Sequence, residues 1–439
     1  MSSIEIGVIS IMMILVLIYA GMYVPVVLAL VSFLGVWAIK GNVIIAIKLL
    51  TLAASDSVAN YIFGVIPLFV LMGLLVGAAD MGTETFAVAN QLFRRVRAGL
   101  GIATVAANAV FAAITGISIA SAAIFTRVAV PEMLRYGYRP RFAVGVVAGS
   151  SILGMLIPPS LLLIVYAVLT EQSVGDMFLA AVIPGIVLSL AFCLAIMLMA
   201  RFAPAYVGGP TDADAATDEG ELMSAAEMVG KLAPIGLLVL MVIGGIYGGV
   251  FTPTEAGAAG ALGALIIAIA KRKLDLAAFW KVLIETGHIM ASICFLVIAA
   301  SMYSRMLGLS GIAGELGSLV ETAAFGLYGV LAIYVLLLLL LGTVLDSTSI
   351  ILIMVPLFMP MLAPFGADLV WFGIITVIGV EIGLLTPPLG IAAYVIKSTL
   401  DTDEISLYDI FAGAFPFAVI MLLMVILIIA VPEIALAPV

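Results

Sequence analysis

The sequence predicts an all-α polytopic membrane protein built from two repeats of inverted topology. The 439 residues are 65% hydrophobic and 10% charged, with a mean hydropathy of +1.36, whereas a soluble domain is about half apolar and about a quarter charged. Apolar runs of about 18 residues or more recur along the chain, which predicts helices rather than barrel strands. The third observation is a repeat: Gly154-Met-Leu-Ile-Pro-Pro recurs as Gly383-Leu-Leu-Thr-Pro-Pro.

The repeat extends beyond the two double prolines. From Pro158 to Pro387 the spacing is 229 residues. Each copy holds one break rich in Gly, Ser and Thr and one Gly-x-x-x-Pro-Pro break inside apolar sequence. Two such copies are typical of secondary transporters, whose broken helices meet near the bilayer midplane. The matching residues are Ser118, Pro131 and Gly137 with Ser347, Pro360 and Gly366, and, after a short insertion, Asp176, Phe178 and Pro184 with Asp409, Phe411 and Pro416.

Residues 1–99 are expected to form scaffold helices. Residues 4–39 hold two spans separated by a turn signal, and residues 61–80 hold another. Residues 41–59 are shorter and mixed, which predicts an amphipathic helix on the membrane surface. The orientation of this region stays open, because its two lysines would fall on the outer face, against the positive-inside rule.

The first repeat core is expected at residues 100–203. Residues 100–134 are apolar, but Thr115-Gly-Ile-Ser-Ile-Ala-Ser121 interrupts them. Since Arg residues flank both ends, a re-entrant hairpin that opens to the cytoplasm keeps all of them inside. Residues 142–169 then form the first Pro-Pro-broken helix, and residues 177–200 return. The flanking basic residues are Arg94, Arg95, Arg97, Arg135, Arg139 and Arg141.

An acidic cytoplasmic connector is expected at residues 204–228, and a second scaffold set at residues 229–325. That set crosses the membrane at residues 229–250, 256–270 and 283–305, so five crossings separate the two hairpins. Because five is odd, the second repeat is inverted. The connector's acidic residues are Asp212, Asp214, Asp218, Glu219 and Glu221.

The second repeat core is expected at residues 326–439. It holds a hairpin at residues 326–364 and a broken helix at residues 370–396, followed by a last span at 410–431. The hairpin should open to the outside, because its flanks are acidic. Those flanking acids are Glu315, Glu321 and Asp368.

The breaks expose oxygen atoms that suit a hard cation. Proline has no backbone N–H, so carbonyls about one turn earlier lose their partners, and Gly154 and Gly383 stand at that position. Ser118 and Ser121 present both hydroxyls on one face of a helical turn. Gly342 is expected to do in the second hairpin what Gly116 does in the first. The helix N-termini that follow the tips favour a carboxylate.

Four further residues are candidates for contact with substrate, and a fifth has an open role. Gly116 lies at the first tip, and Asp346 and Ser347 at the second. Arg127 either faces the substrate anion or, as we prefer, snorkels to the cytoplasmic interface. Glu381 serves either as a proton site or as a stabilising group. Neither of the two cysteines nor the single histidine builds a metal site.

These motifs resemble the large membrane subunit of tripartite ATP-independent periplasmic (TRAP) transporters. The resemblance covers nearly the whole chain and implies an elevator-type transport domain on a scaffold, in a sodium-coupled importer of organic anions in the bacterial inner membrane. The implied partners are a separate small four-helix membrane subunit, a periplasmic substrate-binding protein and membrane lipid, with no nucleic acid. The motifs are Thr115-Gly-Ile-Ser-Ile-Ala-Ser-Ala-Ala, Gly154-Met-Leu-Ile-Pro-Pro-Ser, Thr252-Pro-Thr-Glu-Ala, Leu345-Asp and Thr386-Pro-Pro-Leu-Gly.

The same resemblance implies two Na⁺ sites and no organic cofactor. The first would use Ser118, Ser121, Gly154, Ile157 and Pro159, and the second Gly342, Gly383, Thr386 and Leu389. The copies differ where Thr386 offers a hydroxyl and Ile157 only a carbonyl, so we do not expect equal affinities.

Three other functions are compared with this one. A stand-alone ion-coupled carboxylate carrier would need no binding protein. A membrane-embedded enzyme lacks support, because the sequence holds no metal cluster, nucleophile–base set or phosphate loop. A passive channel is disfavoured, because two inverted hairpins with closed tips favour alternating access. The sequence does not name the substrate.

Overall fold

The computed structural model describes residues 2–59, 61–209, 222–312, 314–315, 318, 326–388, 390–400 and 404–439. Over these residues the chain is helical, with one isolated β-bridge between Tyr138 and Gly208. By length and composition, six of the described helices could cross a membrane, or eight if two bent pairs each count as one span. The acidic cluster of the connector, Glu321 and Leu389 lie outside the described residues.

The N-terminal half holds scaffold helices and the first repeat core. The 3-10 turn Tyr61–Gly64 precedes α4. The helices are α1 (Ser3–Tyr19), α2 (Val24–Lys40), α3 (Val43–Ala59), α4 (Val65–Ala78), α5 (Met81–Phe93), α6 (Gly99–Thr115), α7 (Ser118–Arg135), α8 (Pro140–Ser151), α9 (Leu153–Leu156), α10 (Leu161–Thr170), α11 (Val174–Phe202) and α12 (Pro204–Val207).

The C-terminal half covers the segments expected to form the second scaffold set and the second repeat core. A π-helical turn, Leu240–Gly244, joins α13 to α14, and a 3-10 turn, Ala363–Phe365, follows α19. The helices are α13 (Ala225–Val239), α14 (Gly245–Tyr247), α15 (Pro253–Ala270), α16 (Leu276–Ser310), α18 (Gly326–Gly342), α19 (Ser347–Leu362), α20 (Leu369–Gly383), α21 (Ile391–Thr399), α22 (Leu407–Ala430) and α23 (Glu433–Leu436).

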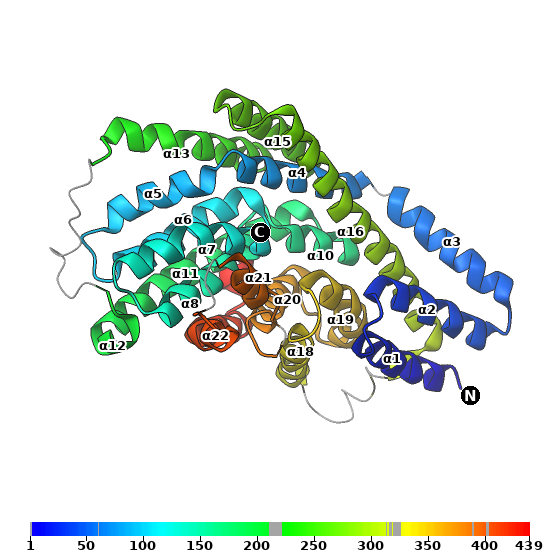
Figure 1. Ribbon diagram of the computed structural model, residues 1–439. Helices are drawn as coiled ribbons and strands as arrows, with labels where there is room; N and C mark the ends of the chain where they lie inside the picture. Colours follow the sequence, from blue (N-terminus) through cyan, green and yellow to red (C-terminus); the bar gives the residue numbers. More distant parts are fainter. Residues whose placement is uncertain are drawn as a thin grey trace.

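Helices α1, α2, α3, α13, α15 and α16 lie around the edge of the molecule in Figure 1. The long helix α16 packs against α1, α2, α3 and α4. Arg305 on α16 pairs with Asp56 on α3 at 2.6 Å. The expected surface segment at 41–59 is therefore a helix, α3, and it is fastened to the rest of the scaffold through α16.

The segment after residue 80 forms a helix for which the sequence analysis gave no separate prediction. The span expected at 61–80 is α4, but a second helix, α5, follows it and turns by 63°. Asp80 at the junction adopts a left-handed conformation with φ of +58°. The composition of α5 is mixed, and the helix buries an apolar face that includes Met81 and Phe86.

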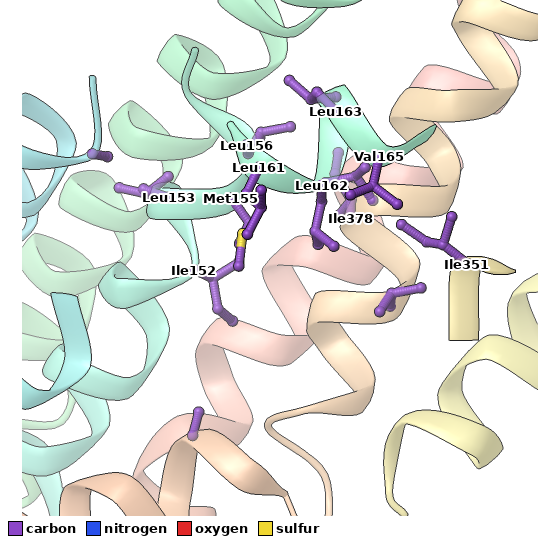
Figure 2. Packing of buried hydrophobic residues seen from close by; sticks show 14 of the residues in the cluster. Ile152, Leu153, Met155, Leu156, Leu161, Leu162, Leu163, Val165, Ile351 and Ile378 are labelled. Atoms are coloured by element: carbon purple, nitrogen blue, oxygen red, sulfur yellow. The ribbon is translucent and has the colours of Figure 1, made fainter. Parts of the chain in front are cut away.

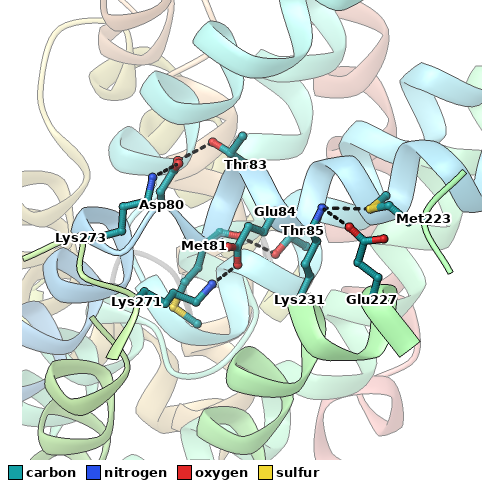
Figure 3. Close-up of polar contacts among 10 residues, drawn as sticks. All are labelled: Asp80, Met81, Thr83, Glu84, Thr85, Met223, Glu227, Lys231, Lys271 and Lys273. Carbon is teal, nitrogen blue, oxygen red and sulfur yellow. Dashed lines mark hydrogen bonds and ion pairs between the residues drawn. The ribbon is translucent and has the colours of Figure 1, made fainter. Parts of the chain in front are cut away.

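Lysines from the turn between α15 and α16 hold this bend in place (Figure 3). Lys273 pairs with Asp80 at 3.4 Å, and Lys271 pairs with Glu84. Thr83 donates a hydrogen bond to Asp80 at 2.6 Å. The basic turn that follows α15 is thereby attached to the start of α5.

Two helical hairpins and two broken helices form the interior. Helix α6 packs on α7, and α18 packs on α19. Only residues 116–117 and 343–346 separate the arms. The second arms of the two hairpins begin at Ser118 and Ser347, which are 229 residues apart. The two broken helices begin at Pro140 and Leu369, which are also 229 residues apart.

The broken helices also agree with the prediction. Helices α8 and α9 form the first half of one, and α10 the second, with a bend of 41°. Helices α20 and α21 form the other. Pro158–Pro159 and Pro387–Pro388 are both cis peptide bonds. The bounds 142–169 and 370–396 were therefore predicted to within a few residues.

Both ends of the first hairpin lie at one end of the molecule. Burial raises the pKa of Tyr138, just after α7, to about 12, and a hydrogen bond with the backbone of Leu100 offsets part of this rise. Leu100 lies in the first turn of α6. The two ends of the first hairpin therefore lie close to each other.

In each repeat, the second half of the broken helix packs on the other repeat. Helix α10 of the first packs on α19 and α20 of the second, and α21 of the second packs on α7 of the first. Figure 2 shows Leu162 and Val165 of α10 beside Ile378 of α20. Tyr166 stacks edge-on against Phe372, whose ring also contacts Tyr334. These contacts join the two cores into one apolar interior.

Candidate ion and substrate site at the hairpin tips

The first tip rests on the first Pro-Pro break. Gly116 ends α6 with φ of +62°, and a Cβ atom there would lie 2.5 Å from the carbonyl oxygen of Pro159. The N–H of Leu161 donates a hydrogen bond to the carbonyl of Gly116 at 3.1 Å. A Cβ atom on Gly154 would lie 3.1 Å from the carbonyl oxygen of Ile117. Glycine is required at position 116, because the backbones approach so closely there and φ is positive, and Gly154 allows a further close contact.

Two hydroxyls at this tip are buried without partners. Ser118 is 2% exposed and Ser121 0%, and neither side-chain oxygen has a hydrogen-bond partner among the described residues. A buried hydroxyl without a partner is costly. The oxygen-rich surroundings therefore suit a hard cation, and the tip brings four of the five expected residues close to one another: Ser118, Ser121, Gly154 and Pro159. Ile157 lies at the same break, and its side chain packs on Gly185.

The second tip is built differently. Gly342 is the last residue of α18 and lacks the left-handed conformation of Gly116. A Cβ atom on Gly342 would lie 2.5 Å from the Cα of Gly383. Gly342 therefore differs from Gly116 in conformation, although both glycines meet the backbone of a broken helix. The reason is that residues 343–346 extend the second tip beyond Gly342.

Thr386 completes the described part of the second site. Its hydroxyl donates a hydrogen bond to the carbonyl of Gly383 at 2.7 Å. The hydroxyl's lone pairs stay available to a cation, since donation uses only its proton. Gly342, Gly383 and Thr386 therefore lie together, and Leu389 lies outside the described residues.

Asp346 caps the helix that follows the second tip. Its carboxylate accepts a hydrogen bond from the N–H of Ser349 at 3.0 Å and another from the Ser349 hydroxyl. An Asp three residues before a Ser, at the start of an apolar run, is a capping signal in the sequence. Asp346 also lines a cavity of about 460 Å³ between the second tip and the scaffold. The other polar side chains lining it are Tyr23, Ser292, Thr348 and Ser349.

Two candidate substrate residues lie away from this cavity. Arg127 is exposed, and its position on α7 is about 13 Å along the helix from Ser118. Ser347 instead points to Glu381, whose Oε1 accepts a hydrogen bond from the Ser347 hydroxyl at 2.8 Å. Glu381 is completely buried. The structure therefore brings Ser347 together with Glu381 and leaves Arg127 on the outer surface of the chain.

A second buried polar pair was missed by the sequence analysis. Asn108 on α6 donates a hydrogen bond to Ser150 on α8 at 2.7 Å, and both side chains are buried. The pair ties the first arm of the hairpin to the first half of the broken helix. A single Asn inside the apolar run 100–114 was the available signal, because such residues bond across membrane helices.

The family follows from the comparisons with known proteins. Residues 11–434 match the family described as Tripartite ATP-independent periplasmic transporter, DctM component. The chain belongs to this family. It is a large permease subunit of a TRAP transporter and a multi-pass membrane protein, and its relatives are transporters rather than enzymes.

Relatives of this TRAP permease carry several kinds of organic anion. The chain is 32% identical over 393 residues to the C4-dicarboxylate TRAP transporter large permease protein DctM of Pseudomonas aeruginosa, covering 89% of each chain. It is 30% identical over 375 residues to the sialic acid large permease SiaM of Vibrio cholerae, covering 85% of each. It is 28% identical to the isethionate permease DctMQ of Oleidesulfovibrio alaskensis, covering 78% of this chain and 53% of that protein.

A solved structure shares the fold. The Alcanivorax borkumensis YdaH transporter, whose structure is described as having an unusual topology, matches this TRAP permease with a TM-score of 0.61. The match covers 88% of both chains at 13% sequence identity. At that identity, the likeness concerns the fold alone.

Proposed function

We propose that this TRAP permease is a sodium-coupled secondary active importer of small organic anions. The observation that carries the proposal is the pair of buried, unpartnered hydroxyls of Ser118 and Ser121 at a tip seated on the Pro158–Pro159 break. Oxygen atoms that lack partners inside an apolar interior need an ion or water. Carbonyl and hydroxyl ligands without nitrogen or sulfur select a hard cation.

The first sodium site would use the hydroxyls of Ser118 and Ser121 with backbone oxygens of the break, at Gly154, Ile157 and Pro159. The second would use Gly342, Gly383, Thr386 and Leu389. Sodium supplies positive charge where the helix N-termini already favour an anion. The second site differs because the Thr386 hydroxyl is already bonded to Gly383.

The substrate would occupy the cavity between the second tip and the scaffold. Its lining includes the hydroxyl groups of Ser292, Thr348 and Ser349, which can donate to a carboxylate or sulfonate. The Asp346 carboxylate caps the N-terminus of α19 and so holds this wall of the cavity in place. Because it is negatively charged, Asp346 contacts a hydroxyl group of the substrate rather than its anionic group. Arg127 contributes to anion attraction from the surface, in keeping with its exposure.

The transport cycle we propose is an elevator between inverted repeats. The reciprocal packing of α10 on α19 and of α21 on α7 supports a single moving body made of both hairpins and both broken helices. Helices α1 to α3, α13, α15 and α16 would form the scaffold. Parting the hairpins would expose unpaired backbone groups to lipid, which is costly.

The proposed partners are a periplasmic substrate-binding protein and a separate small membrane subunit, in the bacterial inner membrane. The test is uptake into proteoliposomes that contain both membrane subunits, with the binding protein and a panel of labelled carboxylates and sulfonates. Uptake should require an inward sodium gradient and the binding protein. Uptake without the binding protein would favour a stand-alone carrier, and downhill flux without sodium would favour a channel.

A further inference from the structure

Glu381 lies where the second arms of both hairpins begin. Its Oε1 atom holds the hydroxyl of Ser347, the first residue of α19, at 2.8 Å. Ser118, the first residue of α7, interacts with the same carboxyl group, although its hydroxyl does not meet hydrogen-bond geometry. The second carboxyl oxygen, Oε2, has no hydrogen-bond partner among the described residues. One buried carboxyl group therefore faces both repeats.

The charge of this group has no protein counter-charge. None of the ion pairs between described residues involves Glu381. An isolated carboxylate inside a protein is costly unless it is paired or binds a cation. The N-termini of α7 and α19 begin beside it, but a helix N-terminus carries only about half an elementary positive charge. A cation would balance the charge that remains.

The proposed ligands around Ser118 lack the negative charge that would balance a bound cation. Two hydroxyls and three backbone carbonyls bring no formal charge to the first proposed sodium site. A cation there would sit uncompensated in an apolar interior. Ser118, Ser121 and Glu381 carry three buried side-chain oxygens without partners, and Ser118 stands next to both its own site and the carboxyl group. The neutral ligands around Ser118 lack a negative charge to balance a bound cation, and the Glu381 carboxylate has a negative charge that no protein group balances.

We infer that Glu381 supplies the negative charge of the first sodium site, and so joins ion binding in the first repeat to the tip of the second. This inference rests on the proposed sodium-coupled function. Because the same carboxylate holds Ser347, an ion beside Ser118 also fixes the start of α19. Sodium binding therefore orders both hairpin tips, and not only the tip whose hydroxyls bind it.

The test measures sodium binding directly, with radioactive ²²Na⁺ on the purified full-length chain and the membrane subunit that co-purifies with it. Glu381→Gln keeps the size of the side chain but removes its charge. The matched control is Thr376→Val on the same helix, where a buried hydroxyl bonds Tyr334 at 2.9 Å and has no proposed role in ion binding. We expect the sodium affinity to fall about tenfold or more in Glu381→Gln and to stay near wild type in Thr376→Val. The protection against thermal unfolding that sodium gives should shrink in parallel.

Equal sodium affinity in wild type and Glu381→Gln, with both chains folded, would overturn the inference, because an uncharged side chain would then suffice. If Glu381→Gln does not accumulate, Glu381→Asp tests the same point. Its carboxylate is one methylene further from Ser118, so we expect weaker but measurable binding, and wild-type affinity would contradict the inference. A wild-type chain that binds no sodium would instead refute the proposed function itself.

Discussion

Gly342 and Gly383 meet backbone to backbone, so closely that a Cβ atom on Gly342 would lie 2.5 Å from the Cα of Gly383 and one on Gly383 would lie 2.6 Å from the Cα of Gly342. The contact joins the end of α18 to the end of α20. Small residues allow such approaches between membrane helices. No flexible side chain intervenes that could move aside, so the second hairpin and the second broken helix are held in fixed register.

Gly342→Ala should therefore destabilise the protein by about 1–3 kcal/mol, the usual cost of adding a methyl group to a packed interior. Thermal unfolding of the purified chain is the measurement. The control is Gly308→Ala on α16, where an added Cβ atom meets nothing within 4 Å, and a Gly-to-Ala change in a helix is neutral or mildly stabilising. Equal melting temperatures for Gly342→Ala and wild type would show that the two backbones can separate at little cost.

Sodium activation should depend on the hydroxyls of both proposed sites. Ser118→Ala and Thr386→Ala each remove one oxygen ligand and no apolar surface. Losing a ligand should cost about 1–3 kcal/mol, or about ten- to a hundredfold in apparent sodium affinity. Sodium-dependent uptake curves provide the readout, and docking of the binding protein should change less.

Ser189→Ala is a suitable control for those variants, because that hydroxyl only bonds the carbonyl of Gly185 within α11 at 2.8 Å. Unchanged activation curves for both Ser118→Ala and Thr386→Ala would contradict the two sodium sites. A change in only one of them would refute the site that is unaffected.

The proposed topology predicts from which face of the membrane the residues that flank each hairpin can be labelled. Cysteines at positions 97 and 135 should react with a membrane-impermeant reagent from the cytoplasmic face, and those at 321 and 368 from the other. The physical reason is the placement of basic residues at both ends of the first hairpin. The background must lack Cys193 and Cys294, which are unpaired. Finding 97 and 135 on opposite faces would rule out a re-entrant hairpin.

Much of the interior could be predicted because the sequence repeats itself. The second arms at Ser118 and Ser347 and the breaks at both double prolines follow directly from the 229-residue spacing. Repetition separates a real break from the isolated Gly, Ser or Pro that any membrane helix can contain.

The features that could not be predicted depend on long-range contacts. Helix α5 has a mixed sequence, and its pairing of Glu84 with Lys271 joins residues that are 187 positions apart in the chain. The bond between Ser347 and Glu381 joins two helices whose relative rotation no spacing reveals. The register of Gly342 also differs from that of Gly116, because the second tip is longer. The cap formed by Asp346 was readable, since Asp before Ser-Thr-Ser is a helix-start pattern.

Paired crosslinks test whether both hairpins and both broken helices move as one body against the scaffold. One pair of cysteines joins the facing sides of α7 and α21, which pack together across the repeats. The other joins the facing sides of the scaffold helix α16 and of α19, which also pack together, at positions that do not line the proposed substrate cavity. In proteoliposomes the first crosslink should leave most sodium-driven uptake intact, and the second should abolish it until a reductant is added. Loss of uptake with the α7–α21 crosslink, together with normal uptake with the α16–α19 crosslink, would contradict rigid-body motion and favour independent gating of the two tips.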